Sequence, residues 1–191
     1  MTYCTTTLLR DYLGIESAVT DEAILRNYIQ SATRQIDAYC HRTFEGSAST
    51  RYVDAIGEHI RGRVLYVDHV GELASITSIT NGDGVTVASD EYTTEPRNET
   101  PYWAIRLLGS AGKTWTYSTD WEGAIAINGI WAYSETAPDD IRDACAHLAA
   151  FYYRQKDQPF TDVTAVEAGV VVRPVGIPAH IKMMLDPYRK P

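Results

Sequence analysis

Cysteine is scarce in this sequence, and the three residues present stand far apart. Cys4, Cys40 and Cys145 form no Cys-x-x-Cys pair. A disulfide framework needs several cysteines at regular spacings, and a zinc ribbon needs two closely spaced pairs. Neither is indicated, and so few cysteines favour a reducing compartment.

Long hydrophobic runs are also missing. No stretch approaches the roughly 18 apolar residues of a membrane-spanning helix. The opening residues Met1–Thr7 lack the basic and apolar regions of a secretion signal. We therefore expect a soluble protein that is made in the cytoplasm.

Basic residues are fewer than acidic ones. Lysine and arginine number 17 against 25 aspartates and glutamates, which gives a formal net charge of -8. Such a chain is repelled by phosphate backbones, so ordinary DNA clamping is disfavoured. A protein that lets DNA slide past without binding is compatible with this sign, and so is a protein whose acidity only aids solubility.

Catalytic and metal-binding motifs are absent. The chain has no Gly-x-Ser-x-Gly, phosphate-binding-loop or dinucleotide-binding sequence, and its five histidines form no metal-binding pair. Asp139, Asp140 and Asp143 lie at a predicted helix start, where carboxylates stabilise the helix dipole. We predict no catalytic residue, no metal site and no cofactor, and hence a protein that is not an enzyme.

The first part of the chain predicts two helices. Thr5–Thr7 can cap a short helix that ends at Leu13, with Gly14 as its left-handed C-cap. A longer helix follows, with Thr20 as the expected N-cap. Its apolar residues recur at spacings of three and four and so share one face, namely Leu25, Tyr28, Ile29, Ala32, Ile36 and Tyr39.

From Thr50 to Tyr133 the pattern changes to short β-branched runs separated by glycine and asparagine. Asn81–Gly84 predicts a hairpin turn, because these residue types tolerate positive φ. The predicted strands are Arg51–Asp54, Val64–Val67, Ser75–Thr80, Val85–Val87, Trp103–Leu108 and Ala124–Tyr133, the last with a break at Asn128 and Gly129.

Aromatic residues are concentrated in this β-rich segment. Trp103, Trp115, Trp121 and Tyr117 can fill a core, contact a partner protein, or stack on bases or sugars. Few basic residues accompany them. We predict that these four residues contact a neighbouring subunit or the next component of an assembly, and the alternative function is a nucleic-acid or carbohydrate-binding module.

A third helix is predicted to begin at Pro138, and its small residues favour close approach of the earlier long helix. Beyond Gln158 we expect irregular chain with a possible strand at Val170–Val172 and a brief helix over Pro178–Leu185. The predicted fold class is α+β. Residues 1–49 and 134–158 form a small core of antiparallel helices, residues 50–133 form an inserted β-rich domain, and residues 159–191 form an extended C-terminal arm.

The order of these parts resembles that of the tailed-bacteriophage head-tail connector proteins, also called adaptor or head completion proteins, in the long form with an inserted β domain. The resemblance covers most of the chain. Its motifs are packing and turn signatures in a characteristic order, namely Leu8–Ile15, Ile36–Phe44, Leu73–Gly84, Ile127–Tyr133, Ala137–Arg142 and Leu185–Arg189.

This resemblance implies a structural virion protein at the head-tail interface, made in the host bacterial cytoplasm. Members of the family assemble into a ring, usually of twelve copies, that joins the portal protein of the head to a stopper or tail protein. Genomic double-stranded DNA passes through the lumen without sequence-specific binding, and no membrane is involved.

In such adaptors the C-terminal segment commonly reaches toward the portal. The resemblance therefore makes this segment the expected portal contact, through Met183, Met184, Leu185, Tyr188 and Arg189. On this hypothesis, deleting the residues after Pro178 leaves the subunit folded but blocks docking.

Overall fold

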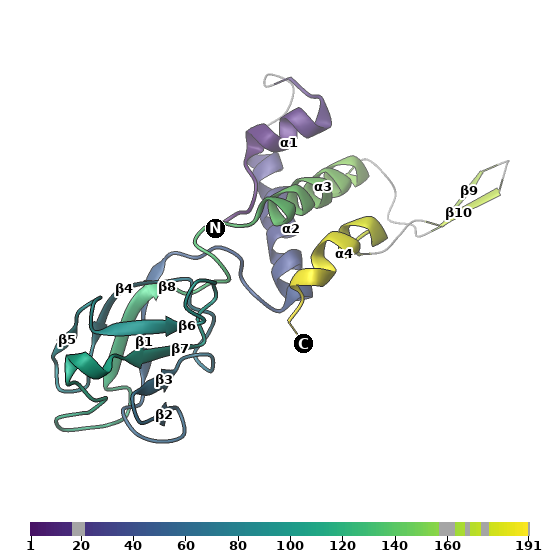
Figure 1. Ribbon diagram of the computed structural model, residues 1–191. Helices are drawn as coiled ribbons and strands as arrows, with labels where there is room; N and C mark the ends of the chain where they lie inside the picture. The colour runs from purple at the N-terminus through teal and green to yellow at the C-terminus, as the bar shows by residue number, and fades with distance from the viewer. Residues whose placement is uncertain (17–21, 157–162, 167–168, 173–175, 191) are drawn as a thin grey trace. The chain divides into compact units, whose positions relative to one another are not determined.

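The computed structural model describes residues 1–16, 22–156, 163–166, 169–172 and 176–190. The chain divides into two compact units (Figure 1). The helical unit comprises Met1–Arg42 and Ala137–Pro191, and the β unit comprises Thr43–Thr136. The predicted α+β class is confirmed, with α-helices confined to one unit and two four-stranded antiparallel sheets in the other.

Helix α1 (Thr6–Leu13) has the predicted caps. The Thr5 hydroxyl accepts a hydrogen bond from the Leu8 amide at 3.1 Å, and Gly14 has φ 67°. Helix α2 (Glu22–Cys40) buries most of its predicted stripe, including Leu25, Ile29 and Ile36. The expected N-cap of α2, at residue 20, lies outside the described residues.

Helix α3 (Asp139–Gln155) crosses α2 within the helical unit (Figure 1). The Cys145 sulfur lies 3.6 Å from the Thr33 hydroxyl in the buried centre of this contact. The Tyr153 ring packs edge-on against the Tyr28 ring, with ring centroids 6.0 Å apart. The small buried residues Ala144 and Ala149 allow this close approach.

The C-terminal part of the chain contains more regular structure than the sequence predicts. A two-stranded hairpin pairs β9 (Val163–Val166) with β10 (Gly169–Val172). Helix α4 (Ala179–Leu185) then packs against α3 and α2, and a 3-10 turn (Asp186–Tyr188) follows it. Among the described residues, no helix is both long and apolar enough to cross a membrane.

Two sheets build the β unit, and neighbouring strands in each are antiparallel. The first sheet has the order β1 (Ala48–Val53), β8 (Ile125–Ile130), β4 (Ser75–Thr80) and β5 (Thr86–Val87), and the second has the order β2 (Ile60–Arg61), β3 (Val64–Tyr66), β7 (Ala104–Leu107) and β6 (Tyr92–Glu95). Strands β2 and β6 were not predicted, because the first is very short and the second is mostly polar.

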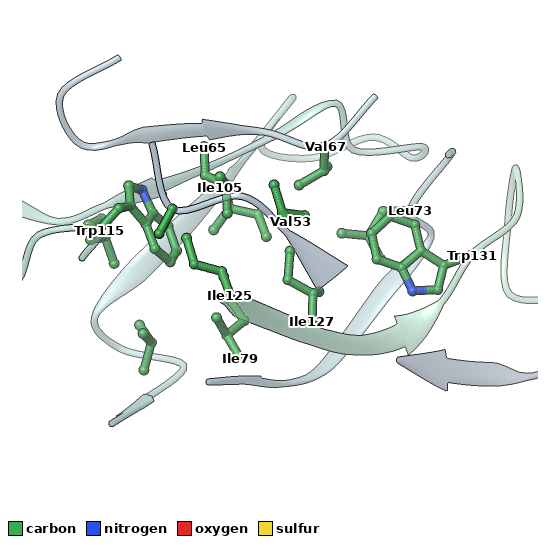
Figure 2. Packing of buried hydrophobic residues seen from close by; sticks show 13 residues of the cluster. Val53, Leu65, Val67, Leu73, Ile79, Ile105, Trp115, Ile125, Ile127 and Trp131 are labelled. Atoms are coloured by element: carbon green, nitrogen blue, oxygen red, sulfur yellow. The ribbon is translucent and has the colours of Figure 1, made fainter. Parts of the chain in front are cut away.

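The core of the β unit lies between inward-facing residues of both sheets. Figure 2 shows Trp115 and Trp131 at opposite ends of this cluster, with aliphatic side chains between them. Each indole N–H is satisfied by a backbone carbonyl, that of Arg63 at 3.0 Å and that of Ser49 at 3.1 Å respectively. The tryptophans therefore close the core without leaving a buried donor unpaired.

The β unit is longer than the predicted segment 50–133 at both ends. The Tyr133 amide donates a hydrogen bond to the Thr43 carbonyl at 2.8 Å, and the Tyr133 ring packs against Phe44 with centroids 5.6 Å apart. Residues that enter and leave the unit are thus paired with each other. This pairing joins positions that are 90 residues apart, which local sequence patterns do not reveal.

The predicted break at Asn128 and Gly129 is wrong, because β8 runs without interruption through both residues. A Cβ atom at Gly129 would lie 2.1 Å from the Ser75 carbonyl oxygen. Glycine is present here because the backbone of β4 approaches closely next to a register shift between Ile76 and Ser78.

The predicted hairpin turn at Asn81–Gly84 is confirmed, and it joins β4 to β5. Asn81 has a second role. Its buried side chain donates to the Thr114 carbonyl at 2.9 Å and accepts from the Thr116 amide at 3.2 Å. The turn therefore holds the segment that places Trp115 in the core.

Candidate assembly surfaces

The C-terminal residues predicted to contact a portal are not equally accessible. Met183 is 75% exposed on α4, whereas Leu185 is fully buried with Ile181. Positions 181 and 185 are four apart and so share the inner face of the helix. Leu185 is therefore a core residue of the helical unit, and its assignment as a docking contact is wrong.

Residues 186–190 are held against the rest of the helical unit by hydrogen bonds. The Tyr39 hydroxyl donates to an Asp186 carboxylate oxygen at 2.5 Å, a hydrogen bond that raises the pKa of Tyr39. The Tyr188 hydroxyl donates to Asp140 at 3.2 Å, and the Lys190 amide donates to the Cys40 carbonyl at 2.9 Å. These described residues are thus part of the packed unit and do not form an extended arm.

Two other predicted portal contacts remain at the surface. Arg189 is exposed, with its guanidinium 5.5 Å from the centre of the Tyr39 ring. Met184 is half-buried beside the exposed Met183. The surface that remains available at this end of the helical unit is therefore formed by Met183, Met184, Tyr188 and Arg189, and we call it the α4 surface.

Of the four aromatic residues predicted as contacts, one is buried and three are exposed. Trp115 is 7% exposed and belongs to the core of the β unit, so its assignment as a contact is wrong. Trp103, Tyr117 and Trp121 are 45%, 41% and 36% exposed. Large aromatic groups at the surface are common in protein interfaces, so these three remain candidates.

Trp103 is the end of a stacked row on the β unit. Its ring stacks on Tyr66 with centroids 5.8 Å apart, and the Arg61 guanidinium lies 5.7 Å from the Tyr66 ring on β3. Sequence reasoning did not single out Tyr66, although its alternation with the inward-facing Leu65 could have identified it as a surface residue. We call Arg61, Tyr66 and Trp103 the aromatic row.

A second exposed group surrounds the end of β1. The Trp121 carbonyl accepts a hydrogen bond from the Ala55 amide at 2.9 Å, which places the Trp121 backbone beside the residue that precedes Ile56. Tyr52 and Ile56 are 64% and 42% exposed. Sequence reasoning missed both residues, because a hydrophobic side chain next to a strand normally suggests a core position.

The net charge is concentrated in the β unit. Residues 43–136 contain 13 acidic and 6 basic side chains, a net of -7, whereas the remaining residues contain 12 and 11, a net of -1. The exposed aromatic residues of the β unit therefore lie on a strongly acidic body, which is unsuited to binding phosphate backbones.

All three cysteines lie in the interior of the helical unit. Cys4 and Cys145 are buried, and the hydrogen bond to Cys145 together with burial raises the pKa of the Cys4 thiol. Burial also raises the pKa of Cys40 to about 11. Within the described part of the chain, no three histidine, cysteine or acidic residues are placed to hold a metal ion.

Two histidines of the β unit form a stacked pair. The His59 and His69 rings lie 3.5 Å apart between centroids, with 11° between their planes. Burial and then the neighbouring His59 lower the pKa of His69, against the opposing effect of the carboxylates of Asp68, Asp54 and Glu58.

The stacked pair predicts a pH dependence of stability. A lowered pKa means that unfolded His69 binds a proton more readily than folded His69 does. The stability of the β unit should therefore be complete above the ordinary pKa of about 6.5 and fall as the pH drops below it. Urea unfolding midpoints measured from pH 8 to pH 5 test this. His69→Gln should flatten the decline, His180→Gln in the helical unit should not, and an unchanged slope in the His69 variant would contradict the prediction.

A family model described as "Head completion protein" matches residues 3–191. A comparison with curated proteins finds no match.

Solved structures share the fold. A chain from the neck of an empty GTA particle computed with C6 symmetry is 19% identical, with a TM-score of 0.59 over 98% of this chain and 90% of that chain. A chain from the virion of a native gene transfer agent (GTA) particle is 17% identical, with a TM-score of 0.56 over 98% and 90%. A chain from the neck of a native GTA particle computed with C12 symmetry is 16% identical, with a TM-score of 0.51 over 100% and 93%. None of these matches supports a nucleic-acid or carbohydrate-binding module.

Proposed function

Because this chain belongs to the head completion protein family, we propose that it is an adaptor subunit that joins the portal of a phage-like head to the tail or stopper. The observation that carries the proposal is the family match over residues 3–191, supported by a shared fold with chains from particle necks. The protein is then a component of the virion, synthesised in the host bacterial cytoplasm, and its role is structural and not enzymatic.

The adaptor forms a homo-oligomeric ring of twelve copies around the DNA exit channel. One neck structure that shares the fold was computed with C12 symmetry, which supports this number. A rotational ring requires two different, complementary faces on each subunit. The net charge of -8 lets genomic double-stranded DNA pass without sequence-specific binding, and no membrane takes part.

We assign the two units to different partners. The α4 surface, which includes the exposed Met183 and Arg189, contacts the portal protein. The exposed aromatic groups of the acidic β unit, which include Trp103, Tyr117 and Trp121, contact a neighbouring subunit or the stopper or tail protein. Adaptable methionine and a cation suit the first role, and large aromatic anchors suit the second.

Electron microscopy of the purified chain mixed with its portal tests the function and the assignment. The native chain should form a ring on the portal. Met183→Asp should weaken portal binding about 30-fold, the typical effect of losing an interface anchor, because it places a charge in an apolar contact. The measurement is the portal occupancy as a function of chain concentration.

Trp103→Ala is the matched comparison. It should leave portal binding unchanged and reduce the binding of the next component. Val85→Ala removes another exposed apolar side chain, 48% exposed, and should change neither. A native chain that never forms a ring with the portal would contradict the function, whereas full portal binding by Met183→Asp would contradict only the assignment of the α4 surface.

A further inference from the structure

Two of the three cysteines are in contact inside the helical unit. Cys4 precedes α1, whereas Cys145 lies in the middle of α3. Both side chains are buried, and the Cys4 thiol donates a hydrogen bond to the Cys145 sulfur. The third thiol, that of Cys40, faces the Leu185 carbonyl at 3.8 Å instead. The fold therefore brings one pair of thiols together from segments that are far apart in the sequence.

The Cys145 sulfur has polar neighbours in an otherwise apolar core. Among the residues that the structure describes, the buried polar side chains are those of Thr33 and Asn81, and Asn81 belongs to the β unit. The Thr33 oxygen accepts a hydrogen bond from the Tyr3 backbone amide at 3.4 Å and lies 3.6 Å from the Cys145 sulfur. Its own hydroxyl proton is thus available to the sulfur, and such a bond favours the thiolate form.

These contacts make the two thiols unequal. The hydrogen bond from Cys4 lowers the pKa of Cys145 against the opposing effect of burial, and the Thr33 hydroxyl and the backbone amides of Tyr3 and Cys4 lower it further. The same hydrogen bond, and then burial, raise the pKa of Cys4. A thiol pair with one more acidic member suits thiol-disulfide exchange, because the thiolate is the form that attacks a disulfide.

We propose that Cys4 and Cys145 form a redox site, at which a small disulfide oxidant links the two sulfurs and thereby attaches the N-terminal segment to α3. A disulfide brings its sulfurs closer together than a hydrogen bond does. Residues 1–4 precede the N-cap of α1, so Cys4 can move toward Cys145 without disturbing a helix. Since the amides of Tyr3 and Cys4 cover the Cys145 sulfur, lifting this segment admits the oxidant to both thiols.

Oxidised glutathione is an oxidant of this class. The Cys145 thiolate attacks one of its sulfurs, its S–S bond breaks, and the departing glutathione thiolate takes up the proton that Cys145 lost. The Cys4 thiolate then attacks the Cys145 sulfur of the mixed disulfide, and the second glutathione leaves and takes up the Cys4 proton. The two protein thiols lose two electrons in all, and one glutathione disulfide becomes two thiols.

The link itself is independent of the proposed function, but its timing rests on that function. A chain made in a reducing cytoplasm keeps both thiols, and a virion released from the cell meets oxidising conditions. The link therefore forms after assembly, and it stabilises the helical unit in the released particle.

The purified chain tests the link. It is incubated with oxidised glutathione, quenched by acid and alkylation, and measured by mass spectrometry and thermal unfolding. The chain should lose the mass of two hydrogen atoms, yield a linked pair of peptides that contain Cys4 and Cys145, and gain about 10 °C in the Tm of the helical unit. A reducing agent should reverse all three changes. Cys40→Ser should behave as the native chain does, whereas Cys4→Ser should form no link and gain no Tm.

The native chain alone decides the outcome, whether or not the variants fold. A native chain that stays reduced under excess oxidised glutathione overturns the redox site, and so does a link that forms only in urea, since the two cysteines would then be ordinary core residues. Links through Cys40 or between copies also overturn it. Rapid alkylation of released particles tests the timing, which free thiols at both positions would contradict. A chain that forms the link but no ring on a portal retains the redox site and contradicts only the proposed function.

Discussion

Removing residues 179–191 is expected to unfold the helical unit. The deletion takes away Ile181 and Leu185, both fully buried. Burying one such side chain contributes about 1.5–3 kcal/mol, so the loss is about 3–6 kcal/mol, against a total of about 5–15 kcal/mol for a typical domain. The hydrogen bonds from Tyr39 to Asp186 and from Tyr188 to Asp140 are lost as well.

Thermal unfolding followed by far-ultraviolet circular dichroism measures this effect. A loss of about 3 kcal/mol lowers Tm by about 12 °C or more in a unit of this size. A shorter deletion, of residues 189–191 only, keeps both core residues and should lower Tm by only a few degrees. Met183→Ser changes an exposed side chain and should cost less than about 0.5 kcal/mol.

The resemblance to the family led to the opposite hypothesis, that the subunit stays folded when the residues after Pro178 are deleted. Failure of the truncated chain to dock on a portal would not identify a portal contact, because its helical unit would already be disrupted. An unchanged Tm and helix content in the truncated chain would restore the interpretation of this segment as an arm.

Gly129→Ala is expected to destabilise the β unit strongly. The new Cβ would lie 2.1 Å from the Ser75 carbonyl oxygen and 3.2 Å from the Ile76 Cα atom. Both atoms belong to backbone, which a rotamer change cannot move. Since β8 is an interior strand between β1 and β4, the pairing of β4 with β8 must shift, at a cost of about 3 kcal/mol, the upper end of the usual range for overpacking.

Urea unfolding followed by tryptophan fluorescence measures the cost, because Trp115 and Trp131 report on the core of the β unit. Gly112→Ala is the control. Gly112 has φ 64° but no atom within 4 Å of an added Cβ, so its substitution should cost only about 1–2 kcal/mol of backbone strain. The steric explanation for Gly129 fails if its substitution is no more destabilising than that of Gly112.

The sequence alone determined the features that depend on neighbouring residues. The Thr5 and Gly14 caps, the one-sided stripe of α2 and the Asn81–Gly84 turn are local patterns, because a helix turn or a hairpin turn is completed within a few residues. The order of these patterns was also sufficient to indicate the family, since it is a property of the chain and not of its folding.

Only the tertiary structure decided which apolar residues form the core and which form surfaces. Trp115 and Trp103 are the same residue type in the same segment, yet Trp115 is buried, with its indole N–H bonded to the Arg63 carbonyl 52 positions away. Leu185 and Met183 differ for a similar reason, since Leu185 packs near Cys40, whose thiol faces the Leu185 carbonyl at 3.8 Å.

The same holds for Gly129, which local sequence predicts as part of a break within a strand but which is an interior strand position that the β4 backbone approaches. Short or polar strands such as β2 and β6 are likewise defined by the strands that they pair with. Burial and strand pairing depend on residues that are distant along the chain, and local periodicity contains no information on which of these become neighbours.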